Sequence, residues 1–274
     1  MERNAADLEE KIEKYLQFWS NNGMDRPLLG FSLGGYFPFM SFKGSSGFRV
    51  GGHLAPEMIN PEAFLDDYER IVDSWGRVED DVIRAVAPLP GFPWLEAMVG
   101  CPVRVSTESV WAEPRNASWE ELEGLNISSE NPWLQKYLEF LEALVEHAEG
   151  RYPVGQPFFR GVSDLMAALR GSDRLILDMY DAPDKVLRLA EACTSIFKKV
   201  IEHHFEIVPE FDGGYVVEQF ALWAPDRVVR LQEDASALYS PKFYRDLLRP
   251  YDAELAASYR YNVIHLHSSS LSYI

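Results

Sequence analysis

Two histidines near the end of the sequence, His265 and His267, have the spacing that most directly suggests a chemical role. They close the segment 261–267, whose alternating side chains predict a β-strand. Residues two apart on a strand point to the same face, so both imidazoles would lie together at its carboxyl end. Neutral imidazole is a good zinc ligand, and two on one face could share a metal ion. The alternative is a pair of polar strand-end residues that are hydrogen-bonded to nearby carboxylates.

Three acidic residues could act together with these histidines. Asp81 follows a second acid at the start of a predicted strand, and its carboxyl could serve as a general acid or base if it is buried. Glu218 lies near the end of another predicted strand, and Asp234 lies in the segment LQEDAS. Each of these two could orient a histidine or ligate a metal. The alternatives are a solvated acidic pair at Asp81, and helix capping or a buried salt bridge at Asp234.

The elements that must position these residues alternate along the chain. Hydrophobic periodicity and helix-start signals predict helices over residues 8–19, 61–75, 93–99, 132–149, 164–169, 182–205 and 240–260. Strand-like segments are residues 28–33, 81–87, 103–111, 154–159, 214–220 and 261–267. Strands that alternate with helices predict an α/β fold with parallel strands. The strand ends at Leu33, Ala87, Phe220 and His267 are expected to converge on one cleft, because βα barrels carry their chemistry there.

The number of βα units is smaller than a full barrel requires. No repeat or linker divides the chain, so residues 1–274 are expected to form a single domain with an N-terminal helix packed outside it. About five or six units predict a (β/α)8 barrel of the TIM type that is truncated at its C-terminus or completed by something outside this sequence. An unpaired parallel edge would favour a homo-oligomer.

Composition excludes several classes of partner. With 26 Lys and Arg against 43 Asp and Glu, the formal net charge of −17 disfavours nucleic acid and anionic membrane surfaces. Two cysteines, Cys101 and Cys193, cannot build a disulfide framework, and the acidic start lacks the pattern of a secretory signal, so a cytoplasmic location is expected. No apolar stretch approaches the length needed to cross a bilayer. Nucleotide-binding and serine-hydrolase motifs are also absent from the sequence.

Several segments, in order along the chain, resemble the uroporphyrinogen decarboxylase superfamily. This superfamily includes zinc-dependent methyltransferases that move methyl groups between corrinoids and thiols such as coenzyme M. The segment 231–250 (LQEDASALYSPKFYRDLLRP) is similar to the family's Asp-x-x-x-x-Leu-Ser-Pro…Pro-Tyr and is the most specific match. Further similarity lies at residues 81–83 (DVI) with 100–103 (GCPV), and at 161–171 (GVSDLMAALRG). Residues 265–268 (HLHS) fall where the methyltransferase branch carries His-x-Cys-Gly.

The resemblance implies a (β/α)8 barrel and favours the methyltransferase branch. Residues 30–42 contain no arginine, although the decarboxylase carries an arginine-rich motif there that grips the porphyrinogen carboxylates. In the methyltransferase branch, zinc holds a thiol as the reactive thiolate. His265 matches the first zinc ligand of that branch, and His267 replaces a cysteine.

The leading hypothesis is therefore a metal-dependent methyltransferase that moves a methyl group between a corrinoid and a thiol or other small substrate. Asp81, His265 and Asp234 are the candidate catalytic residues, and His265, His267 and Glu218 are the candidate zinc ligands. A corrinoid protein is a possible partner. The alternatives are a decarboxylase that acts through Asp81 on a porphyrinogen-like or other small substrate, and an inactive barrel that binds a corrinoid or a partner protein.

Overall fold

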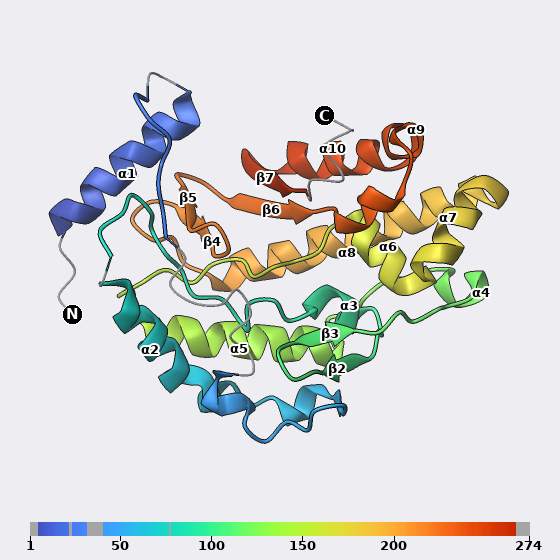
Figure 1. Cartoon of the computed structure of the whole chain (residues 1–274), viewed down its shortest axis with the longest axis horizontal. Coiled ribbons are helices and arrows are strands. Elements are labelled where there is room, and N and C mark those ends of the chain that lie inside the picture. Colours follow the sequence, from blue (N-terminus) through green and yellow to red (C-terminus); the bar gives the residue numbers. More distant parts are fainter. Residues whose placement is uncertain (1–4, 22–23, 32–40, 77, 267–274) are drawn as a thin grey trace.

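The computed structural model describes residues 5–21, 24–31, 41–76 and 78–266, and mixes helices with short strands (Figure 1). The helices are α1 (Ala5–Ser20), α2 (Leu65–Trp75), α3 (Trp94–Met98), α4 (Trp119–Leu122), α5 (Pro132–Ala148), α6 (Val162–Arg170), α7 (Ser172–Asp181), α8 (Pro183–Ile207), α9 (Pro241–Phe243) and α10 (Arg249–Ser258). The strands are β1 (His53–Leu54), β2 (Val103–Val105), β3 (Val110–Ala112), β4 (Tyr215–Val217), β5 (Leu222–Ala224), β6 (Val228–Gln232) and β7 (Tyr261–His265). A π-helical turn, Tyr244–Leu248, joins α9 to α10.

Each predicted helix is present in the structure, whereas α4 and α7 were not predicted. The side chain of Asn131 accepts hydrogen bonds from the backbone N–H groups of Trp133 and Leu134, at 3.0 and 3.1 Å, and so caps the start of α5. The Ser240 hydroxyl caps α9 in the same way, and Pro183 occupies the first turn of α8, where a missing N–H costs nothing. Local chemistry is sufficient to start these helices.

Part of the structure is a series of extended segments that pair in parallel with one another. Isolated parallel bridges join Val86 to Val154 and Gln156 to Val217. Strands β6 and β7 pair in parallel, with Gln232 opposite His265. The Gln156 side chain links this series to β6, because it bonds the backbone of the β6 residue Arg230 through both amide atoms. The carboxyl ends of these segments therefore lie at one edge, which agrees with the predicted convergence for Ala87 and the β4 end, whereas Leu33 and His267 lie outside the described residues.

Other strands contradict the prediction of an all-parallel arrangement. The predicted strand 103–111 is an antiparallel hairpin of β2 and β3, to which β1 adds a third strand. The predicted strand 214–220 ends at Val217 and turns back as β5, and β6 was not predicted. Residue alternation does not reveal where a chain reverses, so the two hairpins escaped detection. Within the described residues the sheets are small and do not close into a barrel.

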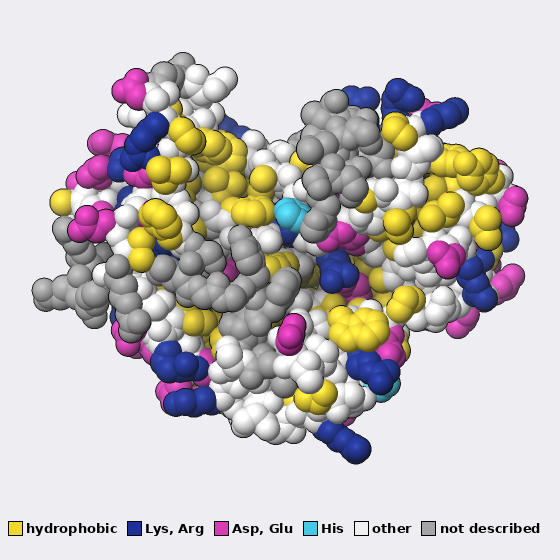
Figure 2. Space-filling view, in the orientation of Figure 1, with side chains coloured by type: hydrophobic (Ala, Val, Ile, Leu, Met, Phe, Trp, Pro, Cys, Tyr) yellow, Lys and Arg dark blue, Asp and Glu magenta, His cyan; other side chains and the backbone are white. Residues whose placement is uncertain are grey.

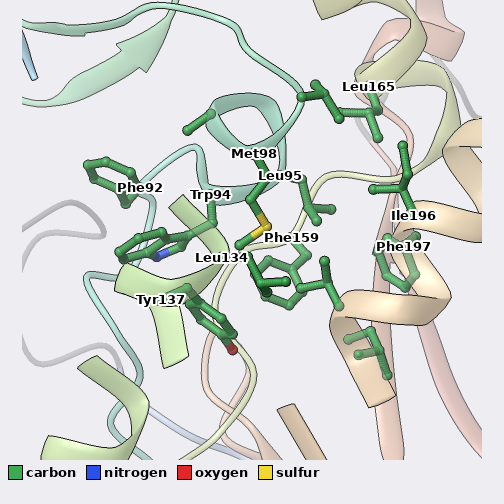
Figure 3. Packing of buried hydrophobic residues seen from close by; sticks show 14 of the residues in the cluster. Phe92, Trp94, Leu95, Met98, Leu134, Tyr137, Phe159, Leu165, Ile196 and Phe197 are labelled. Carbon is green, nitrogen blue, oxygen red and sulfur yellow. The ribbon is translucent and has the colours of Figure 1, made fainter. Parts of the chain in front are cut away.

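The hydrophobic core gathers around α8, which packs against α5, α6, α7 and α10. Figure 3 shows the part where α3 and α5 meet α8. Trp94 and Tyr137 lie with ring centroids 5.3 Å apart, and Tyr137 is in turn 5.3 Å from Phe159. These aromatic residues are fully buried and fix the helices against the segment that leads to the strand ends.

The N-terminal helix α1 packs against the β4–β5 hairpin, in agreement with the expectation of a helix that packs against the chain that follows it. The Trp19 indole donates to the carbonyl of Trp223 at 2.8 Å, and the hydroxyl of the buried Tyr15 donates to the carbonyl of Ala221. These bonds join α1 to the hairpin. Across the described part of the chain, none of the helices combines the length and the apolar character needed to cross a membrane.

Candidate functional site at the strand ends

Glu218 directly follows β4 and lines a cavity of about 640 Å³. Its Oε2 atom is buried and has no hydrogen-bond partner among the described residues. Burial raises the pKa of the Glu218 carboxyl to about 8, and the positive charge of Arg230 offsets part of this shift. A carboxyl with a pKa close to neutral can both give and take a proton under physiological conditions.

Arg230 is fully buried in β6, behind the wall of this cavity. Its guanidinium lies 5.4 Å from the ring centroid of Phe158 and 5.5 Å from that of Phe220, and both rings line the cavity. One of its nitrogens donates to the side-chain oxygen of Gln232. Among the described residues, no carboxylate lies within 4.0 Å of the Arg230 guanidinium. The acids Glu96 and Asp234 pair with Arg160 and His265 instead.

Arg230 keeps its positive charge although it is buried without an acidic partner in the described part of the chain. Burial lowers the pKa of its guanidinium to about 10, whereas the negative charges of Asp234 and Asp164 act in the opposite direction. Arg230 therefore remains a cation at neutral pH, and it places a fixed positive charge beside the cavity.

Asp164, Asp234 and His265 form a polar group at the same edge. The Asp164 carboxylate accepts hydrogen bonds from the backbone N–H groups of Asp234 and Ala235, at 3.2 and 2.6 Å. Burial raises the pKa of the Asp164 carboxyl to about 7. His265 Nε2 lies 3.9 Å from Asp234 Oδ1, and the His265 ring is centred 5.9 Å from the ring of Phe220. The polar group thus borders the cavity wall at Phe220.

A buried carboxyl holds this edge in place. Glu233, in the turn after β6, accepts hydrogen bonds from the backbone N–H groups of Val162 and Ser163, at 2.9 and 2.8 Å, and so caps α6. Gly161 makes this close approach possible, because a Cβ at that position would lie 1.7 Å from Glu233 Oε1. Glu233 therefore fixes the start of the helix that carries Asp164.

The structure does not bring Asp81 to the histidine. Asp81 precedes Val86 by five residues, or about 16 Å of extended chain, whereas His265 lies at the carboxyl end of β7. Hydrogen bonds from Arg26, at 2.6 and 2.9 Å, hold the pKa of the Asp81 carboxyl well below its usual range. Lys14 adds an ion pair at 2.9 Å. The contacts of Asp81 anchor the N-terminal segment, and among the described residues Asp81 neither contacts His265 nor lines the cavity beside Glu218.

The predicted zinc site is only partly described. Glu218, Asp234 and His265 lie at the strand ends. The remaining predicted zinc ligand, His267, is outside the described residues. Among the residues that the structure describes, no group of three or more His, Cys, Asp and Glu side chains is placed to hold a metal. Cys101 and Cys193 are both buried and free.

Sequence reasoning missed Arg230 and Asp164. An arginine within an otherwise apolar run, VVRLQ, was a signal for Arg230, because a charged residue in a buried strand needs a local reason. Asp164 follows Gly161 by three residues at a helix start, where an acid is usually an exposed cap. Figure 2 shows histidine, basic and acidic side chains close together among hydrophobic ones near the middle of the displayed face.

Comparison with known proteins gives a likeness of fold. No protein-family model matches the sequence, and no curated protein matches it significantly. Solved structures do match, among them a methyltransferase from Methanosarcina mazei with a TM-score of 0.61 and 15% sequence identity. The alignment covers 94% of this chain and 70% of that chain. The chain therefore shares the fold of a methyltransferase over nearly its whole length.

Proposed function

We propose that this chain is an enzyme that transfers a methyl group between a corrinoid and a small substrate held in the cavity beside Glu218. The observation that carries the proposal is the Glu218 carboxyl, which lines a substrate-sized cavity and has a pKa of about 8. The reaction class comes from the fold shared with the Methanosarcina mazei methyltransferase and from the sequence resemblance. Because fold alone does not fix chemistry, the site residues have to supply the rest of the argument.

The cavity sets the size of the substrate. A volume of about 640 Å³ lies within the range of small-molecule sites, and aromatic side chains contribute much of its lining. A corrinoid is a second substrate in this proposal, and its ring system would approach from the mouth of the cavity. A corrinoid protein is the partner that would present it there.

Glu218 would act as the general base that accepts the proton of the methyl acceptor. When a thiol takes a methyl group from a methylcorrinoid, a sulfur–carbon bond forms and the electron pair of the cobalt–carbon bond stays on the corrinoid. The thiol proton must leave, and the Glu218 carboxylate can accept it. A base whose pKa lies near the working pH is best suited to this task.

Zinc is the metal that the sequence resemblance implies, and the described residues do not form a site for it. Catalytic zinc usually has three protein ligands, whereas His265 and Asp234 are the groups found close together here. The proposed transfer therefore has no step at zinc, and His265 is proposed as a polar group that orients the substrate together with Asp234.

The test is an anaerobic incubation of the protein with methylcobalamin and either coenzyme M or 2-mercaptoethanol. Loss of methylcobalamin absorbance and mass spectrometry of the methyl thioether measure transfer. We expect turnover above the protein-free rate, and Glu218→Gln should reduce it by about a hundredfold or more, the usual range for a lost general base. The control is Glu130→Gln, a change at an exposed glutamate.

Absence of methyl thioether above the protein-free rate would contradict the proposal. Release of carbon dioxide from a carboxylated substrate would instead support the decarboxylase alternative. Binding of a corrinoid without turnover would support an inactive binding barrel.

A further inference from the structure

The cavity carries two buried oxygen atoms that have no hydrogen-bond partner among the described residues. They are Glu218 Oε2 and Gln219 Oε1, which belong to consecutive residues after β4. Both residues line the same cavity of about 640 Å³. Buried polar atoms are nearly always paired in folded proteins, so two adjacent unpaired atoms in one cavity indicate a missing ligand group.

The cations that line this cavity are already paired. Arg84 binds Asp80 through Nη1 at 3.0 Å, and Arg70 binds the carboxylate of Asp67. Arg230 lies behind the rings of Phe158 and Phe220 and does not itself line the cavity. The described part of the lining therefore offers unpaired acceptor oxygens and no unpaired cation, which favours a ligand that donates hydrogen bonds over an anion.

The remaining lining is largely apolar and includes several aromatic rings. Its aromatic side chains are Tyr15, Phe18, Phe31, Phe42, Tyr68, Trp75, Phe158 and Phe220. Aromatic faces attract cations, and they also bury the apolar body of a ligand. A group with several N–H donors and a positive charge can donate hydrogen bonds to the two oxygens and be attracted to the faces of the rings.

We propose that Glu218 and Gln219 form an anchoring subsite for a primary ammonium group, and that the substrate is a small amine with an apolar body. An ammonium group has three N–H donors, enough to bond both oxygens. Hydrogen bonds to charged groups are stronger than neutral ones, so the Glu218 contact should dominate affinity. The statement that the bound amine is the substrate rests on the proposed methyl transfer, whereas the binding of the amine does not.

Three probes of nearly equal shape test the subsite: benzylammonium, benzyl alcohol and benzoate. Isothermal titration calorimetry measures their dissociation constants at a pH at which the amine is protonated. We expect benzylammonium to bind at least about tenfold more tightly than benzyl alcohol, and benzoate to bind most weakly. Fluorescence of Trp75, which lines the cavity, reports on occupancy independently.

Two variants assign the contact. Glu218→Gln should weaken benzylammonium by about tenfold to a hundredfold and leave benzyl alcohol within about threefold, because shape is kept and charge is lost. Gln219→Met should weaken benzylammonium by about three- to tenfold. Glu130→Gln is the control and should change neither ligand.

Unchanged benzylammonium affinity in both variants would overturn the inference. So would tighter binding of benzoate that is lost in Arg230→Met, since it would assign an anion site. If Glu218→Gln also loses benzyl alcohol, the Gln219→Met result decides between a binding role and a folding defect. Amine binding without methyl transfer would overturn the proposed function alone, and methyl transfer without amine binding would overturn this inference alone.

Discussion

Replacement of Asp81 by Asn should destabilise the protein, because the carboxylate joins two cations and a backbone group. Asp81 is 5% exposed, and its oxygens accept hydrogen bonds from Arg26, Lys14 and the backbone N–H of Leu29. The Arg26 side chain is 54% exposed and that of Lys14 is 30% exposed, so water screens both ion pairs. With about 1 kcal/mol for each of the three contacts, the expected loss in free energy of unfolding is about 2–3 kcal/mol.

The pH dependence separates this anchoring role from a general loss of stability. The pKa of Asp81 lies well below its usual range in the folded state and near its usual value, about 3.9, in the unfolded state. The stabilisation is therefore complete above the unfolded pKa and is lost as the pH falls through the folded pKa. The stability difference between wild type and Asp81→Asn should thus be constant from pH 5 to 8 and should narrow in acid.

Urea unfolding, followed by circular dichroism at several pH values, measures these differences. Asp25→Asn is the matched control, because Asp25 is an exposed acid in the same N-terminal segment. If Asp81→Asn is as stable as Asp25→Asn at pH 7, the anchoring argument is refuted. Loss of methyl transfer in Asp81→Asn without loss of stability would restore Asp81 as a catalytic candidate.

Three further predictions follow from burial. The folded pKa of Glu218, about 8, exceeds its unfolded value, so the contribution of Glu218 to stability should fall by as much as about 4 kcal/mol as the pH rises from 4.5 to 8, and urea titrations of Glu218→Gln should show a fall smaller than that of the wild type by this amount. Burial lowers the pKa of His204 to about 3, so its ring should stay neutral in NMR spectra at pH 5, and its contribution to stability should be lost as the pH falls below about 6.5. Gly161→Ala should lower the melting temperature, because the added Cβ would clash with Glu233. Gly47→Ala is the control, since a Cβ added there would meet no atom within 4 Å. Equal melting temperatures of the two variants would contradict the close approach of Gly161 to Glu233.

Local sequence signals were sufficient for most of the helices and for one strand. Hydrophobic spacing predicted the long helices, and capping residues such as Asn131 and Ser240 lie where helices begin. Alternation placed β7 and put His265 at its carboxyl end. These features depend on neighbours within a few residues, so the linear sequence contains the information.

Strand direction and pairing depended on contacts far apart in the sequence. The hairpins β2–β3 and β4–β5 reverse inside segments that read as single strands, and the parallel neighbours of β7 come from a strand that was not predicted. Which strand pairs with which is decided by how whole helices pack, and no short window records it.

The same distinction applies to the candidate site. The sequence placed Glu218 and His265 near strand ends and singled out Asp234, but it could not show that Glu218 is desolvated or that Asp81 is held by two cations. It also gave no role to Arg230, whose unpaired charge has meaning only because Phe158 and Phe220 cover it. Residue type and spacing determine which groups can ionise, whereas burial and the charges that folding brings near them decide their pKa values, and these exist only in the tertiary structure.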